Sequence, residues 1–168
     1  MKLRFFVPAV LAGCVVALTS GCAVLSKGRT QTVVVRSVPE GATASINGIE
    51  VGQTPFKTTL KRASAYTVEL RKPGFENMAA VVLPVANEYE KRFLRWGVDY
   101  DLGAMTDLTP EDLVLEMKPV LPDAPAGGDR FQEMTYRVLQ ADALFAAKEI
   151  SRADHKYIVA EIVKFYTN

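Results

Sequence analysis

The sequence is poor in the residues on which catalysis and covalent cross-linking depend. Its 168 residues include one histidine, His155, one tryptophan and two cysteines. Both cysteines lie near the N-terminus, so we expect no disulfide in the folded part. Catalysis needs a base, a nucleophile or a metal held in a pocket. The serines stand in predicted turns with no histidine partner, and paired carboxylates such as Glu88 and Glu90 belong to a charged surface run. We therefore expect a protein that is not an enzyme and needs no cofactor.

The sequence also lacks an excess of charge of either sign. It has 20 basic and 19 acidic residues, and 18 against 19 once Lys2 and Arg4 are lost with the leader described below. Proteins that bind nucleic acid neutralise phosphates with lysine and arginine. The balanced charge gives no electrostatic case for a nucleic-acid partner. The apolar share of 49% is enough for the core of one small domain with appendages.

Residues 1–21 have the order of a bacterial lipoprotein signal peptide. A basic start is followed by an apolar run over residues 5–18 and by three small residues, 19–21, directly before Cys22. Small residues let the extended chain fit the signal peptidase, and the cysteine thiol takes a diacylglyceryl group before cleavage. We predict that Cys22 is lipidated and becomes the first mature residue, with residues 22–31 forming the anchor and a polar tether.

Two alternatives to this processing remain open. Leu11-Ala12-Gly13 before Cys14 also reads as a lipobox, although it leaves an apolar region shorter than the ~7–15 residues that such signals need. The uncharged segment of residues 5–26 is long enough for a single membrane-spanning helix, although Pro8 and Gly13 within it argue against a continuous helix.

The position after Cys22 bears on the membrane to which the anchor is sent. This position is Ala23, whereas an aspartate here would resemble the inner-membrane retention signal of enteric-type bacteria. By that analogy we expect an outer-membrane location, on a face that the sequence leaves undetermined. Durable anchoring takes more than one lipid chain, and a triacylated cysteine satisfies this requirement.

Residues 32–84 alternate turn residues with β-branched runs at short intervals, which predicts a small all-β unit. Asn-Gly favours a two-residue type I′ hairpin because both positions need positive φ. Proline fixes φ, and glycine accepts φ values that other residues avoid. We predict strands over residues 32–37, 42–46, 50–51, 56–61 and 66–71, a last strand ended by Pro84, and a return strand near 114–117. The predicted turn residues are Pro39, Gly41, Asn47, Gly48, Gly52, Pro55, Pro73 and Gly74.

The same stretch resembles the PEGA domain, which is named for the Pro-Glu-Gly-Ala found here at residues 39–42. The elements I-N-G at 46–48, G-x-T-P at 52–55 and Y-x-V-x-L-x-x-x-G-F at 66–75 follow in order. The resemblance covers roughly residues 32–84. It implies a β-sandwich-like module of bacterial envelope proteins, with no catalytic residues to carry over.

Residues 85–118 are a flank that we expect to complete the β module. The spacing of Asp99, Asp101 and Asp107 is similar to that of an acidic loop that binds calcium. A full calcium loop needs an acidic or amide residue where Gly103 stands and a glutamate where Pro110 stands, so we expect no metal and keep these aspartates as a weak candidate site.

Aromatic residues of the flank are the candidate binding groups. Tyr89, Trp96 and Tyr100 could stack on a carbohydrate, whereas we expect Tyr66 and Phe75 to pack in the core. The function that we expect is a non-catalytic envelope module that contacts an envelope protein or polymer. A periplasmic carbohydrate-binding lipoprotein is the alternative.

The C-terminal region changes to a helical pattern after a Pro/Gly-rich linker at residues 119–130. Apolar residues at three- and four-residue steps predict a helix from Phe131 to about Lys148. Ser151-Arg152-Ala153-Asp154 is similar to a capping box and opens a second helix. The pair over residues 131–168 resembles the short C-terminal helix pairs that are linked to self-association in many bacterial proteins. We predict that this tail associates instead of completing the β core.

Overall fold

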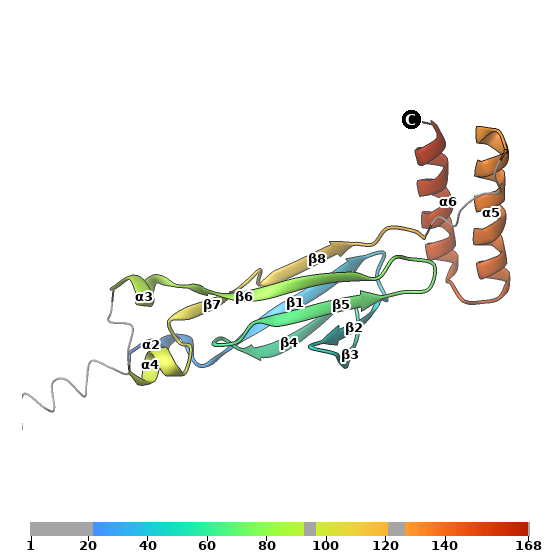
Figure 1. The fold of residues 1–168 in the computed structure, drawn as a ribbon. Helices are drawn as coiled ribbons and strands as arrows, with labels where there is room; N and C mark the ends of the chain where they lie inside the picture. Colours follow the sequence, from blue (N-terminus) through green and yellow to red (C-terminus); the bar gives the residue numbers. More distant parts are fainter. Residues whose placement is uncertain (1–21, 93–96, 121–126, 168) are drawn as a thin grey trace, which may run out of the picture. The chain divides into compact units, whose positions relative to one another are not determined.

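The structure, a computed structural model, describes residues 22–92, 97–120 and 127–167. In these ranges the chain is mainly β, with eight strands in two sheets and two long helices at the C-terminus (Figure 1). The predicted fold class is therefore confirmed. The predicted signal peptide over residues 1–21, including Cys14, and the candidate aromatic Trp96 lie outside the described residues.

The strands form one sheet in the order β4-β1-β8 and another in the order β3-β2-β5-β6-β7. The strands are β1 (Thr30–Val38), β2 (Thr43–Ile46), β3 (Ile49–Gln53), β4 (Phe56–Lys61), β5 (Tyr66–Arg71), β6 (Met78–Ala86), β7 (Thr106–Thr109) and β8 (Asp112–Glu116). The helices are α2 (Cys22–Lys27), α3 (Glu88–Arg92), α4 (Val98–Asp101), α5 (Arg130–Ala146) and α6 (Arg152–Thr167). The flank supplies β8, close to the predicted return strand, and also forms β7, α3 and α4, which the sequence did not predict.

The chain divides into two compact units, each with its own core. The first unit comprises the described residues among 1–34, 57–66 and 81–113, and the second comprises 35–56, 67–80 and the described residues from 114 on. The core of the first unit contains Val33, Val82, Ala104, Met105 and Leu108. The core of the second unit contains Val35, Ala44, Val68, Leu70, Phe75, Met117, Ile150, Ile158 and Ile162.

The β2–β3 hairpin forms at the Asn-Gly pair that the sequence singles out. Ile46 pairs with Ile49, so the loop consists of Asn47 and Gly48, with φ values of 50° and 80°. The Asn47 side chain accepts a hydrogen bond from the Thr67 amide at 2.9 Å, which attaches the turn to β5. A bulge follows, because Ala44 pairs with Gly52 and Ser45 with Glu50. The positive φ of 138° at Gly52 belongs to this bulge.

Strand β6 does not end at Pro84, contrary to the sequence prediction. Pro84 is paired with Leu108 inside the β6–β7 ladder and β6 continues to Ala86. The amide and carbonyl of Leu108 bond instead to the side chain of Gln31, at 2.9 and 3.1 Å. Since those groups point away from β6, the Pro84–Leu108 pair has no ladder hydrogen bond to lose.

Residues 22–31, which the sequence suggested as an anchor and a polar tether, contain regular secondary structure. Residues 22–27 form helix α2, and β1 already begins at Thr30. Ala23 is buried, and Gly28, with φ of 70°, ends the helix by donating its amide to the Val24 carbonyl. This segment is therefore ordered and packed.

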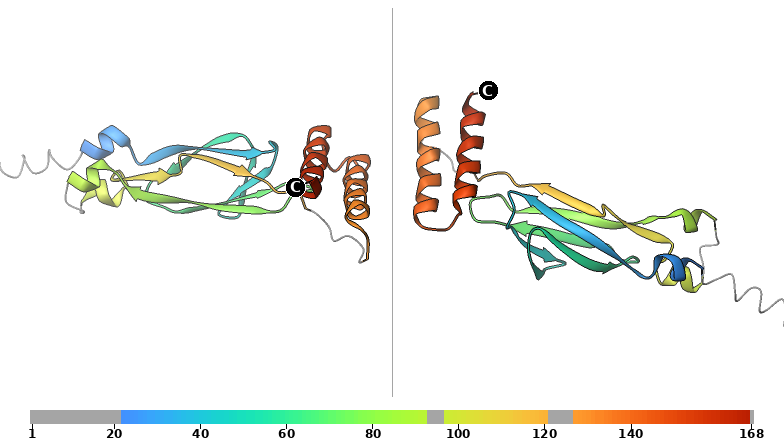
Figure 2. Two further views of the ribbon diagram at one scale, coloured as in Figure 1. Left: turned by 90° about the horizontal axis from the view of Figure 1, so that it is seen from above. Right: turned by 180° about the vertical axis from the view of Figure 1, so that it is seen from behind.

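The C-terminal helices are antiparallel neighbours with well-defined ends (Figure 2). Asp129 caps α5 through a 2.8 Å bond from the Gln132 amide. Lys148, at φ of 60°, and Glu149 donate their amides to the last carbonyls of α5, which is a Schellman end with lysine in place of glycine. The predicted linker is shorter than expected, because Val120 still donates its amide to Gly74.

Candidate functional sites

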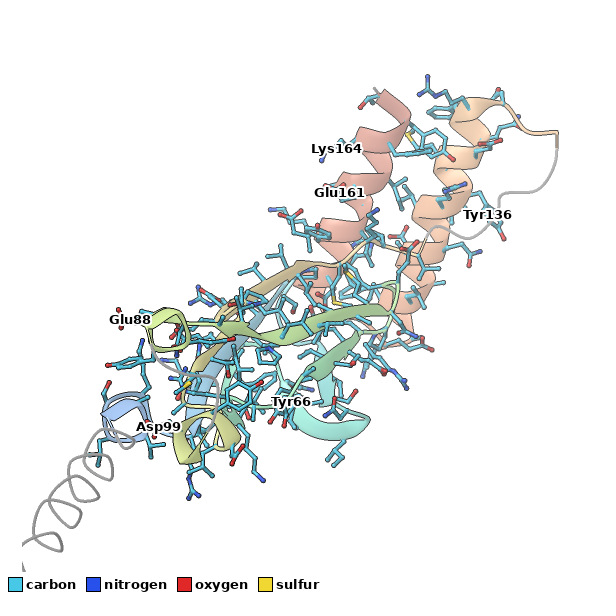
Figure 3. All side chains as sticks on the ribbon, turned by 60° about the vertical axis from the view of Figure 1, so that its left-hand side comes forward. Tyr66, Glu88, Asp99, Tyr136, Glu161 and Lys164 are labelled. Carbon is cyan, nitrogen blue, oxygen red and sulfur yellow. The ribbon has the colours of Figure 1, made fainter. Side chains whose placement is uncertain are left out.

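Helix α2, which begins at the predicted lipidation residue, is bound to its own unit by side chains of α3 and α4. Asp99 of α4, labelled in Figure 3, is buried and accepts the amides of Ala23 and Val24, both at 3.4 Å. The hydroxyls of Ser26 and Tyr89, the latter in α3, lie 2.6 Å apart. A carboxylate at the start of a helix satisfies amides that have no partner within the helix.

A buried arginine joins the β4–β5 turn to β7 in the first unit. Arg62 is 8% exposed and its guanidinium donates to Asp107, to Gln31 and to the carbonyls of Thr30 and Thr106. The carboxylate of Asp107 also lies 3.8 Å from the amine of Lys27. A polar hollow of 430 Å³ opens beside these side chains, lined in addition by Leu108, Thr109 and Glu111. The burial and these four partners give Arg62 a structural role.

The structure assigns the three aspartates of the candidate calcium loop to different tasks. Asp99 binds the start of α2, Asp107 pairs with Arg62, and Asp101 is exposed at the end of α4. Over the residues that the structure describes, no three His, Cys, Asp or Glu side chains come together as metal ligands. The acidic spacing in the sequence thus reflects two separate structural contacts.

The Pro-Glu-Gly-Ala loop is closed by Thr54 of the G-x-T-P element. The Thr54 hydroxyl accepts the Ala42 amide at 3.0 Å and is bonded to the buried Ser37 hydroxyl. Its carbonyl accepts the amide of Gly41, whose φ is 83°. Pro39 and Pro55 both follow cis peptide bonds. The two sequence elements therefore specify one interlocked loop, and their spacing reflects this contact.

Lys72 connects the Pro-Glu-Gly-Ala loop to the C-terminal helices. Its amine donates to the Glu40 carbonyl and lies 3.1 Å from the Asp154 carboxylate, and both side chains of this ion pair are at most 9% exposed. Asp154 also accepts the Ser151 hydroxyl at 2.7 Å, as in a capping box. A Cβ on Gly41 would lie 3.2 Å from the Lys72 amine. A side chain at position 41 would therefore crowd the Lys72 amine.

The turn between β5 and β6 is the surface on which the helical hairpin packs. Pro73 precedes Gly74, which has φ of 81°, and a Cβ at Gly74 would lie 3.1 Å from Ile158 and 3.2 Å from Ile150. The ring of Phe75, 4% exposed, lies 6.0 Å from the ring of Tyr157. One end of the tail therefore belongs to the core of the second unit, which corrects the expectation of an independent tail.

The candidate aromatics do not share a common role. The Tyr89 hydroxyl is engaged with Ser26, whereas Tyr100 is 45% exposed. Tyr66, labelled in Figure 3, closes the β4–β5 turn, because its hydroxyl accepts the Lys61 amide at 2.9 Å. His155 contacts two residues of α5. Its Nε2 lies 2.7 Å from the Asp142 carboxylate and its ring packs 5.1 Å from Phe145.

Sequence reasoning missed Arg62, Lys72 and Gly103. A Cβ at Gly103, which has φ of 74°, would lie 2.5 Å from the Ala63 amide nitrogen, so the two backbones touch. A charged residue beside a predicted turn, such as Lys72 before Pro73, reads as a solvated side chain. No local pattern indicates that such a residue is buried against a segment about 80 positions away along the sequence.

Comparison with known proteins identifies the β module. The family model described as the PEGA domain matches residues 30–95. The chain therefore contains a PEGA domain, a small β module often found in envelope-associated proteins. The match begins at the start of β1 and extends beyond the 32–84 range expected from the motifs. No curated protein and no solved structure matches the chain.

Proposed function

We propose that this protein is a lipid-anchored component of the bacterial cell envelope, held in the outer membrane through Cys22, whose PEGA domain is a non-catalytic structural or binding module. The observation that carries this proposal is the joint occurrence of a lipobox ending at Cys22 and a PEGA domain that begins at residue 30. The helices among the described residues include none long and apolar enough to cross a membrane. The partner is an envelope protein or polymer.

The lipid anchor is tested by metabolic labelling with palmitate. Cys22→Ala is expected to abolish labelling and to leave the precursor unprocessed, because the thiol is the acceptor of the diacylglyceryl group. Cys14→Ala is the matched control and is expected to leave both unchanged. Labelling that survives Cys22→Ala and disappears with Cys14→Ala would move the anchor to the other lipobox. Fractionation of the labelled protein between inner and outer membranes tests the location.

The C-terminal helices support self-association as a second role. Their base is packed on the β5–β6 turn, but Phe131, Leu139 and Phe165 are 70%, 59% and 60% exposed. Within the apolar stripes that the sequence predicted, Ala141, Ile158 and Ile162 are buried but Phe131 and Phe165 are exposed. Leu139 adds an exposed apolar side chain outside the stripe. Exposed apolar surface of this kind on a helix pair is typical of an interaction site.

Light scattering on the mature chain with Cys22→Ser tests this role. The chain is expected to run as a species larger than the monomer, and Phe131→Ser combined with Leu139→Ser is expected to return it to the monomer. Val114→Ser on β8 is the matched control, because Val114 is 52% exposed and lies outside the helices. A parent chain that is monomeric at its highest soluble concentration would exclude association through the tail.

A further inference from the structure

The first observation is that little free chain separates the predicted anchor from the folded unit. Helix α2 begins at Cys22, and only residues 28 and 29 lie between its end and the first residue of β1. The Arg29 carbonyl accepts the Arg62 amide at 3.0 Å, so even this connection is bound. With its first amides on Asp99, α2 is attached at both ends.

The second observation is an exposed apolar pair on α2 and α4. Leu25 is 87% exposed although Ala23 of the same helix is buried, and Tyr100 is 45% exposed on the neighbouring helix. The two helices are neighbours, because Asp99, next to Tyr100, binds the amide of Val24, next to Leu25. The views of Figure 2 show α2 and α4 together at the same end of their unit.

The charges around this pair are mixed. Lys27 is paired with Asp107, Arg29 is exposed, and Asp101 is exposed at the end of α4. A surface of this composition has no strong preference for anionic lipid, since basic clusters produce that preference. An exposed leucine and an exposed tyrosine on neighbouring helices, among charges of both signs, are instead typical of the membrane–water interface.

We propose that Leu25 and Tyr100 form a membrane seat, a surface of the first unit that lies in the headgroup region of the bilayer carrying the Cys22 anchor. The inference rests on the proposed anchor. The helical rise of about 1.5 Å per residue places Leu25 roughly 5 Å along the axis from Cys22. The headgroup region of each leaflet is about 5–8 Å thick. An acylated Cys22 therefore brings Leu25 into or against this region, and the bound α2 brings Tyr100 with it.

The seat is tested on the full-length chain, processed in cells and placed in phosphatidylcholine vesicles that contain a lipid with a nitroxide near its headgroup. Cys22 is acylated in the mature chain, so an introduced cysteine is its one free thiol and takes a fluorescent label. Leu25→Cys and Tyr100→Cys report on the seat. Val81→Cys is the matched control, because Val81 is 51% exposed but lies away from α2. It is five residues, about 16 Å, before the end of β6, and the chain reaches α2 only beyond that end, through Tyr89 of α3.

The expected result is quenching at positions 25 and 100 that is at least threefold stronger than at position 81. Leu25→Ser is expected to weaken quenching at position 100, whereas Leu83→Ser on β6 is expected to leave it unchanged. Mass spectrometry of the same samples reports acylation of Cys22 separately. An acylated chain with equal quenching at all three positions would overturn the seat and leave the anchor standing. An unmodified Cys22 would overturn both.

Discussion

The packing of the helical hairpin on the β5–β6 turn predicts the effect of a single methyl group at Gly74. Gly74 has a positive φ, and its added Cβ would meet the Cδ1 of Ile158 at 3.1 Å and the Cγ2 of Ile150 at 3.2 Å. Carbon atoms in optimal contact lie about 3.5–4.0 Å apart. The methyl group therefore adds crowding to the strain of the left-handed backbone.

Gly48 is the matched control, because it has nearly the same φ of 80° with no atom within 4 Å of the added Cβ. We expect Gly48→Ala to lower the free energy of unfolding by about 1–2 kcal/mol, from backbone strain alone. Gly74→Ala adds about 1–3 kcal/mol from overpacking. Urea denaturation of the mature chain with Cys22→Ser, and hydrogen exchange of the α6 amides, measure this difference.

A double-mutant cycle locates the crowding at one atom. Ile158→Val removes the Cδ1 that lies nearest to the added methyl group, so Gly74→Ala is expected to cost less in the Ile158→Val background. Equal losses for Gly48→Ala and Gly74→Ala, together with no coupling in the cycle, would refute the packing of the hairpin on this turn.

Three further predictions concern stability. Asp154→Ala leaves the buried Lys72 amine without its carboxylate and is expected to lower the free energy of unfolding by about 3 kcal/mol. Asp142→Ala removes a carboxylate that is 54% exposed and is expected to lower it by less than about 1 kcal/mol. The midpoints of urea denaturation compare the two variants. Gly103→Ala forces a Cβ to 2.5 Å from the Ala63 backbone and is expected to lower the melting temperature more than Gly97→Ala, where the added Cβ meets nothing within 4 Å. Burial, followed by the charges of Glu161 and Glu116, raises the pKa of Tyr157. The folded state therefore favours the neutral phenol, and stability is expected to fall as pH rises above about 10, a fall that Tyr157→Phe reduces in urea titrations at several pH values.

Local chemistry was enough to predict the strands and turns of the PEGA domain. Asn47-Gly48 forms the tight hairpin because both residues accept positive φ. Glycine at positions 41 and 74 adopts a left-handed conformation without the steric penalty of a Cβ, whatever surrounds it. Alternation along residues 66–71 likewise fixes which side chains of β5 face the core. The apolar pattern from Phe131 and the capping box at Ser151 are equally local, so the sequence places both helix starts within one or two residues.

Contacts between distant segments were decided by the tertiary structure alone. The sequence predicted an anchor and a polar tether over residues 22–31 and no helix there. The carboxylate that binds the first amides of α2 belongs to Asp99, over 70 positions away. Pro84 predicts the end of a strand when only its neighbours in the sequence are considered. The structure shows that Leu108, opposite Pro84, bonds to the Gln31 side chain and needs no ladder hydrogen bond from proline. Lys72 reads as a solvated charge beside a turn, and Asp154 as a helix cap, until folding buries the two against each other. In each case the stabilising partner is absent from the local sequence, so its free-energy contribution leaves no local pattern from which to predict it.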